Sequence, residues 1–128
     1  MAGIEPVLDG SCFRILAYEL DGESIALRFI TEFRNLLPSR MNRIQRAVGD
    51  QDLAAAMDAV LSLASSASMV GGLQVAHQCR TIGHAVKISD FVTAQRASLV
   101  LEGQTQALAN ELTAMLDARG CRFGGCSA

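Results

Sequence analysis

The sequence predicts an all-α fold, an antiparallel four-helix bundle with a short extra helix at its N-terminal side. Half of the 128 residues are hydrophobic, with alanine and leucine the most frequent, while 5% are aromatic and 2 are proline. This composition favours helices over a β-sandwich. Four long segments repeat apolar residues at spacings of three and four, the period of an amphipathic helix. Short breaks join these segments, as in antiparallel bundles.

The chain has the length of a single domain with its own core. Residues 1–10 contain a proline and glycines and are predicted to form an extended lead-in. Ser11 is the expected N-cap of a short helix that ends at Leu20, and Asp21-Gly22 breaks the chain after it. The apolar face of this helix is expected to hold Phe13, Leu16, Ala17 and Leu20.

The second helix is the clearest in the sequence and ends at Gly49-Asp50. Pro38 lies in its middle and is expected to kink it, because proline removes one backbone donor. Arginines off the apolar stripe are interpreted as a solvated face, with an acidic partner as the alternative; they are Arg28, Arg34, Arg40, Arg43 and Arg46. The apolar stripe covers about six turns and consists of Ala26, Phe29, Ile30, Phe33, Leu37, Met41, Ile44 and Val48.

Three further helices are expected. The third begins near Asp52 and closes at Gly71-Gly72. Its inward stripe is Leu53, Ala56, Met57, Val60, Leu63, Ala64 and Ala67. The fourth covers about residues 73–88, with Val75, Ala76, Cys79, Ile82 and Val86 inward. Ser89 or Asp90 caps the fifth, in which Gly103 predicts a local irregularity, since glycine costs about 1 kcal/mol against alanine. The seam of this fifth helix is Phe91, Ala94, Ser98, Leu101, Thr105, Leu108, Leu112 and Met115.

The bundle is expected over residues 11–119, followed by a flexible glycine- and cysteine-rich tail at 120–128. The tail cysteines Cys121 and Cys126 are interpreted as free thiols, with chelation or a disulfide left open, and Cys12 and Cys79 as small core residues.

Composition also bears on location and partners. A net charge of −2 gives non-specific nucleic-acid binding no electrostatic support. The sequence has no run of about 18 apolar residues, as a membrane-spanning helix would need. Residues 1–6 lack the basic and apolar regions of a signal peptide. The sequence therefore predicts a cytoplasmic protein without a membrane span.

Residues 61–71 read Leu-Ser-Leu-Ala-Ser-Ser-Ala-Ser-Met-Val-Gly. This stretch resembles the signature helix of histidine phosphotransfer (HPt) domains, whose pattern is His, any, Leu, Lys, small, Ser, small, small, any, hydrophobic, Gly. Anchored on Gly71, the pattern puts Leu61 in place of the phosphorylated histidine and Ala64 in place of the lysine. The resemblance covers roughly residues 8–118 and also rests on Leu36-Leu37-Pro38 with Arg40 and Ile44, on Gly49-Asp50-Gln51-Asp52-Leu53 and on Cys79-Arg80-Thr81-Ile82.

Helical periodicity predicts that Leu61 points outward, because it lies one residue off the inward stripe. In the HPt family this face presents the histidine, and its small residues let the receiver domain of a response regulator approach closely. The resemblance therefore implies a partner-binding face formed by Asp58, Leu61, Ala64, Ser65, Ser68 and Gly72.

Leucine has no lone pair, so it cannot take the place of a nucleophilic ring nitrogen. The main hypothesis is thus a degenerate HPt domain, a phosphorelay module without catalysis, cofactor or metal. It is expected to be a monomer that binds a response-regulator receiver domain or a sensor histidine kinase in two-component signalling.

Two alternatives remain open. The first is an active phosphotransfer protein that uses His84 or His77. Leu61 is eleven residues before Gly72 and His84 twelve after it, so an antiparallel pair places them at about the same level. The two histidines are about 10 Å apart along one helix, too far for one zinc ion. The second is a structural or dimeric bundle outside phosphorelay. No phosphate loop or nucleophile–base signature is found in the sequence.

Overall fold

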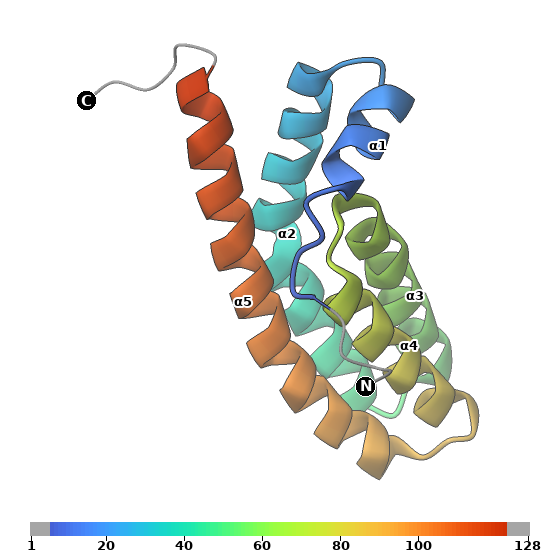
Figure 1. Ribbon diagram of the computed structural model, residues 1–128. Helices are drawn as coiled ribbons and strands as arrows, with labels where there is room; N and C mark the ends of the chain where they lie inside the picture. The colour runs from blue at the N-terminus through green and yellow to red at the C-terminus, as the bar shows by residue number, and fades with distance from the viewer. Residues whose placement is uncertain (1–5, 123–128) are drawn as a thin grey trace.

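The computed structural model describes residues 6–122 and, within them, consists of helices without strands. The helices are α1 (Cys12–Glu19), α2 (Glu23–Gly49), α3 (Leu53–Val70), α4 (Leu73–Lys87) and α5 (Phe91–Arg122). Helices α2 to α5 form the bundle and α1 lies across one end of it (Figure 1). The prediction of an all-α bundle with a short extra N-terminal helix is confirmed.

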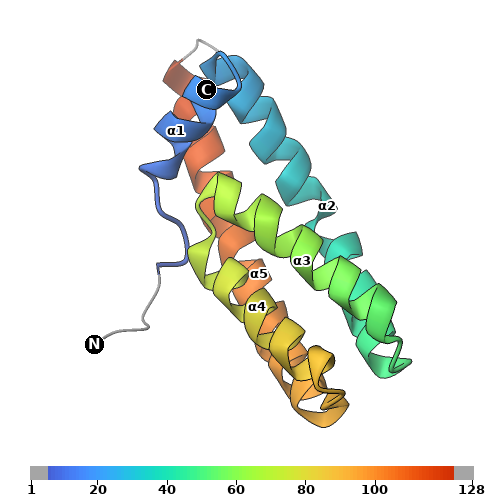
Figure 2. The same cartoon turned by 90° about the vertical axis from the view of Figure 1, so that its right-hand side faces the viewer.

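The order of the helices around the bundle follows from their contacts. Both α2 and α4 pack against α3 on one side and α5 on the other, as Figure 2 shows for the α2–α3–α4 side. The side chains that fill the space between them come from the predicted stripes, and the largest fully buried ones include Ile30, Ile44, Val60, Leu63, Ile82, Leu101, Leu108 and Leu112.

Helix α2 continues without interruption through Pro38. Proline has no backbone N–H, so the carbonyl of Arg34 lacks its usual helical donor at this turn. A kink at Pro38 stays a prediction. The fifth helix is likewise unbroken at Gly103, whose side of α5 is exposed with open space around it. The predicted irregularity is therefore wrong, because a cost of about 1 kcal/mol for one glycine is small beside the packing of the same helix through Leu101 and Leu108, which are fully buried.

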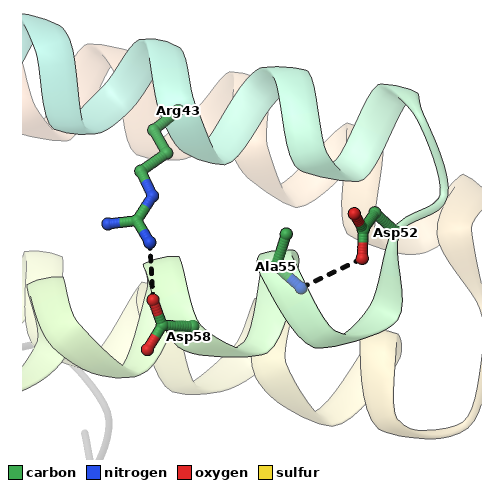
Figure 3. A network of polar contacts seen from close by, with 4 residues as sticks. All are labelled: Arg43, Asp52, Ala55 and Asp58. Carbon is green, nitrogen blue, oxygen red and sulfur yellow. Dashed lines mark hydrogen bonds and ion pairs between the residues drawn. The ribbon is translucent and has the colours of Figure 1, made fainter.

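The N-cap of α3 is Asp52, whose side chain accepts a hydrogen bond from the backbone N–H of Ala55 at 3.1 Å (Figure 3). Gly71 ends α3 with a φ of 90°, a left-handed conformation that glycine adopts without strain. For α5, Asp90 and not Ser89 supplies the cap, because its side chain accepts from the N–H of Thr93 at 3.1 Å. Hydrogen bonds from Thr93 hold the pKa of Asp90 below its ordinary value.

The lead-in attaches to the turn between α3 and α4. The N–H of Asp9 donates to the carbonyl of Gly71 at 2.8 Å, and the N–H of Gln74 donates to the carbonyl of Pro6 at 3.3 Å. Ser11 is the N-cap residue of α1, as predicted, but its side chain makes no capping hydrogen bond. Its hydroxyl instead donates to the Asp9 carboxylate at 2.6 Å, and this hydrogen bond lowers the pKa of Asp9.

At the other end, α5 extends to Arg122, so the first three residues of the predicted tail are helical. The rest of the tail, including Cys126, and residues 1–5 lie outside the described residues, as does the side chain of Cys121. Cys79 is fully buried as expected, and burial raises its pKa to about 12. Cys12 is only half-buried, because it lies at the junction of α1 with the end of α3.

Helix α3 is long and apolar enough to cross a membrane by length and composition alone, which the sequence analysis did not anticipate. Such a helix is weak evidence of a span, since core helices meet the same criterion. In the bundle, α3 is the helix richest in small apolar residues, and Ala56, Ala59, Val60, Leu63, Ala64, Ala67 and Val70 are buried.

Candidate functional site

The outward side of α3 carries Leu61, the residue that the sequence pattern predicts in place of the family histidine. Its side chain is 48% exposed, whereas Val60 before it and Leu63 after it are buried in the core. Successive residues of an α-helix are rotated by about 100°, so one step from the buried stripe is enough to turn Leu61 into solvent. The predicted outward orientation of Leu61 is confirmed.

Four of the six residues predicted for the partner-binding face are accessible. Asp58, Leu61 and Ser65 are exposed and Ser68 is half-buried. We call these four residues the docking face. Figure 3 shows Asp58 on the outer side of α3, directed towards α2.

The other two predicted residues do not belong to the docking face. Ala64 is only 3% exposed because it continues the inward stripe of α3. Gly72 is buried as well, since the left-handed turn at Gly71 directs it inward. A Cβ atom on Gly72 would lie 2.6 Å from Cδ2 of Leu108 in α5.

Two arginines of α2 border the docking face on one side. Arg43 forms an ion pair with Asp58, with 2.5 Å between Nη2 and Oδ2 (Figure 3). Arg40 donates to the hydroxyl of Ser66 at 3.2 Å. On the α5 side, Arg34 donates to Thr113 at 3.3 Å. The α2 arginines lie on a solvent-accessible face, as interpreted, and these three also link α2 to its neighbours through polar contacts.

Helix α4 borders the docking face on the other side. Arg80 donates to the hydroxyl of Ser68 at 3.3 Å, and a Cβ atom on Gly83 would lie 3.6 Å from Cγ2 of Val60. These two contacts fix the antiparallel register of α3 and α4. Leu61 is the sequence neighbour of Val60, and His84 is the sequence neighbour of Gly83. Leu61 and His84 therefore lie at similar heights along the two helices.

His84 is exposed and lies in the last turn of α4 together with Lys87. The sequence analysis did not connect these two residues. Lys87 is the single lysine of the chain, and it follows His84 by three residues, the spacing between histidine and lysine in the HPt signature. Residues three apart share a helix face, so this spacing was the available signal. His77 is also exposed and lies two turns earlier on α4.

The charges of this region are unevenly distributed. Asp58 is the single charged residue of α3, whose sequence is LAAAMDAVLSLASSASMV. The cations Arg40, Arg43, Arg80 and Lys87 all come from the helices on either side. The docking face is therefore an apolar and hydroxyl-bearing strip with basic borders. Among residues 6–122, no three histidine, cysteine or acidic side chains gather as a metal site would require.

Comparison with protein families gives one match, to the Hpt domain, over residues 28–119. The matched segment begins in α2 and ends in α5, so it contains the docking face and the basic borders. Residues 8–27, which the sequence analysis included in the resemblance, lie outside it. Neither the curated proteins nor the solved structures contain a match.

Proposed function

Since the chain belongs to the Hpt domain family, a family of phosphotransfer modules in phosphorelay signalling, we propose that it is a non-catalytic member. In this proposal it binds a response-regulator receiver domain, or a sensor histidine kinase, in the cytoplasm without accepting phosphate at the usual position. The observation that carries the proposal is Leu61, which is 48% exposed at the position of the family histidine.

Leu61 has no atom that can attack an aspartyl phosphate, because phosphotransfer needs the lone pair of an imidazole nitrogen. The family lysine is also replaced, by Ala64, which is buried. Both the nucleophile and the cation that neutralises the phosphoryl group are thus missing from α3.

The surface needed for docking is nevertheless present. The small side chains Ser65 and Ser68 leave room for close approach of a partner, and full burial of Leu61 would contribute about 1.5–3 kcal/mol to binding. The arginines of α2 and α4 supply basic borders that attract an acidic partner and orient it.

A pull-down with the wild-type protein and Leu61→Asp, scored for response regulators and kinases, tests this proposal. We expect the wild type to retain a receiver domain or a kinase and Leu61→Asp to lose it. Leu99→Asp is the matched control, because Leu99 is 63% exposed on α5, away from the docking face, and this variant should bind like the wild type. Equal binding by Leu61→Asp and the wild type contradicts the proposal.

The oligomeric state separates this proposal from the structural alternative. We expect light scattering to give the mass of a monomer, 13.6 kDa. A dimer that Leu61→Asp dissociates would instead mean that the docking face binds a second copy of the chain.

A second candidate function, phosphotransfer through His84, rests on the spacing of His84 and Lys87 and on the register that brings His84 to the level of Leu61. Incubation with a phosphorylated receiver, followed by mass spectrometry for phosphohistidine, tests it. Label on His84 that His84→Gln removes would support this function. If the protein binds the receiver but stays unlabelled, phosphotransfer through His84 is excluded. Label on His77 would instead identify His77, two turns earlier on α4, as the phosphorylated residue.

A further inference from the structure

We infer that the docking face selects the unphosphorylated form of a receiver domain, so that phosphorylation of the receiver releases this protein. The inference rests on the proposed function and adds the state of the partner. Its basis is the charge on α3 around Leu61, where Leu61 offers a phosphoryl group no nucleophile and the nearest charge is the carboxylate of Asp58.

In the docking arrangement of the family, the acceptor aspartate of the receiver faces the position that Leu61 occupies here. Phosphorylation of that aspartate adds negative charge and strong acceptor oxygens at the centre of the contact. In a family member with the signature histidine and lysine, these phosphoryl oxygens would have hydrogen-bonding and charged partners. Against the side chain of Leu61 they would lose water without gaining a hydrogen bond, which is unfavourable for any charged group.

The nearest charge on α3 increases this effect. Asp58 precedes Leu61 by three residues on the same face, so its carboxylate lies within about one turn. It is the single charge on α3, and it repels a phosphoryl group. Arg43 is the cation closest to it, and its guanidinium is already engaged in the ion pair with Asp58.

Arg40 and Arg80 are placed to attract the receiver domain as a whole rather than its phosphoryl group. Arg40 binds Ser66 and Arg80 binds Ser68, and these serines are about 7.5 and 10 Å beyond Leu61 along the helix axis. These separations are about one Debye length, which is about 8 Å at physiological ionic strength, so the attraction of these arginines for a group at Leu61 is weakened. The two arginines therefore steer an acidic receiver in either state and discriminate little between the two.

The test measures the dissociation constant for a receiver domain from the same genome, in Mg²⁺, with and without beryllofluoride. Beryllofluoride mimics the phosphoryl group and cannot be transferred, so any chemistry at His84 does not affect the result. We expect beryllofluoride to weaken binding by about tenfold or more, because a buried polar group without a partner costs at least that factor in affinity.

Two variants examine the cause of the preference. Leu61→Lys places a cation at the centre of the docking face and should abolish or invert the preference. Asp58→Asn removes the negative charge and frees Arg43. It should reduce the preference for the receiver without beryllofluoride, and it should leave the apolar contact of Leu61 unchanged. Leu99→Lys on α5 is the control and should keep the wild-type ratio, and circular dichroism verifies that each variant is folded.

The outcomes distinguish the two proposals. A receiver that binds equally well or more tightly with beryllofluoride overturns the inference and leaves the proposed function intact. The same holds if Leu61→Lys and Asp58→Asn both keep the full wild-type preference. Binding of no receiver in either state overturns receiver docking itself, and the inference with it.

Discussion

Helices α3 and α4 lie side by side and are joined by a two-residue turn, yet their exposed sides carry opposite chemistry. On α3 the exposed side chains are apolar residues such as Leu53, Leu61 and Met69, serines and one paired carboxylate. On α4 it holds two histidines, Arg80 and Lys87. The helix predicted to hold the family signature contains neither histidine nor lysine, while the neighbouring helix contains both. Shape and chemistry at this site are therefore separable.

The largest expected effect concerns the two sides of α3 itself. Leu63→Ala should lower the free energy of unfolding by about 2–5 kcal/mol, because it opens a cavity in the core. Leu61→Ala should change it by no more than about 0.5 kcal/mol, as at most surface positions. Urea denaturation measures both. A comparable loss for Leu61→Ala would mean that Leu61 supports the fold rather than a docking face.

A smaller change in stability is expected when a glycine at the end of α3 is replaced, and almost none when a glycine inside α4 is replaced. Gly71→Ala should cost about 1–3 kcal/mol, because the left-handed backbone strains any other residue and the new Cβ would overlap the carbonyl oxygen of Asp9. Gly83→Ala should be neutral or stabilising by up to about 1 kcal/mol, since alanine favours the helix and its Cβ would make an ordinary contact with Val60. Thermal unfolding of the two variants decides between these expectations, and similar melting temperatures would contradict them.

The start of α3 should also be more sensitive than the start of α4. Asp52 caps α3 through the N–H of Ala55, whereas Gly72 gives α4 no side-chain cap. Asp52→Ala should therefore cost about 1 kcal/mol, while Asp52→Asn retains an acceptor and most of the stability. Chemical denaturation at neutral pH measures the difference. If Asp52→Asn were as unstable as Asp52→Ala, the cap would not explain the effect.

The smallest effect concerns the ion pair that links the docking face to α2. A double-mutant cycle with Arg43→Ala and Asp58→Ala should give a coupling of about 0.2–1 kcal/mol that decreases with salt. The two side chains are 58% and 67% exposed, so solvent weakens their attraction. A coupling that does not change with salt would show that the pair acts through packing.

Most of the fold was available from the sequence, because apolar periodicity and turn residues act locally. Most residues of the stripes around Ile44, Leu63 and Leu101 are buried as predicted, whereas Leu53 at the start of α3 is 43% exposed. The errors have a common cause. A capping side chain at Ser11 and an irregularity at Gly103 were expected from residue type alone. Ser11 is the N-cap residue but donates its hydroxyl to Asp9, and α5 continues unbroken through Gly103. Ala64 and Gly72 were assigned to the partner-binding face, although the rotation of α3 turns Ala64 inward and the left-handed turn at Gly71 directs Gly72 inward.

The sequence by itself determined that residues 61–71 contain neither histidine nor lysine, because this follows directly from the residues present. It also determined that Leu61 points outward, because a helix rotates by a fixed angle per residue. Only the tertiary structure decided which charges border Leu61. Arg43, Arg40 and Arg80 come from helices that are distant in sequence, and their contacts with Asp58, Ser66 and Ser68 depend on how α2 and α4 pack against α3.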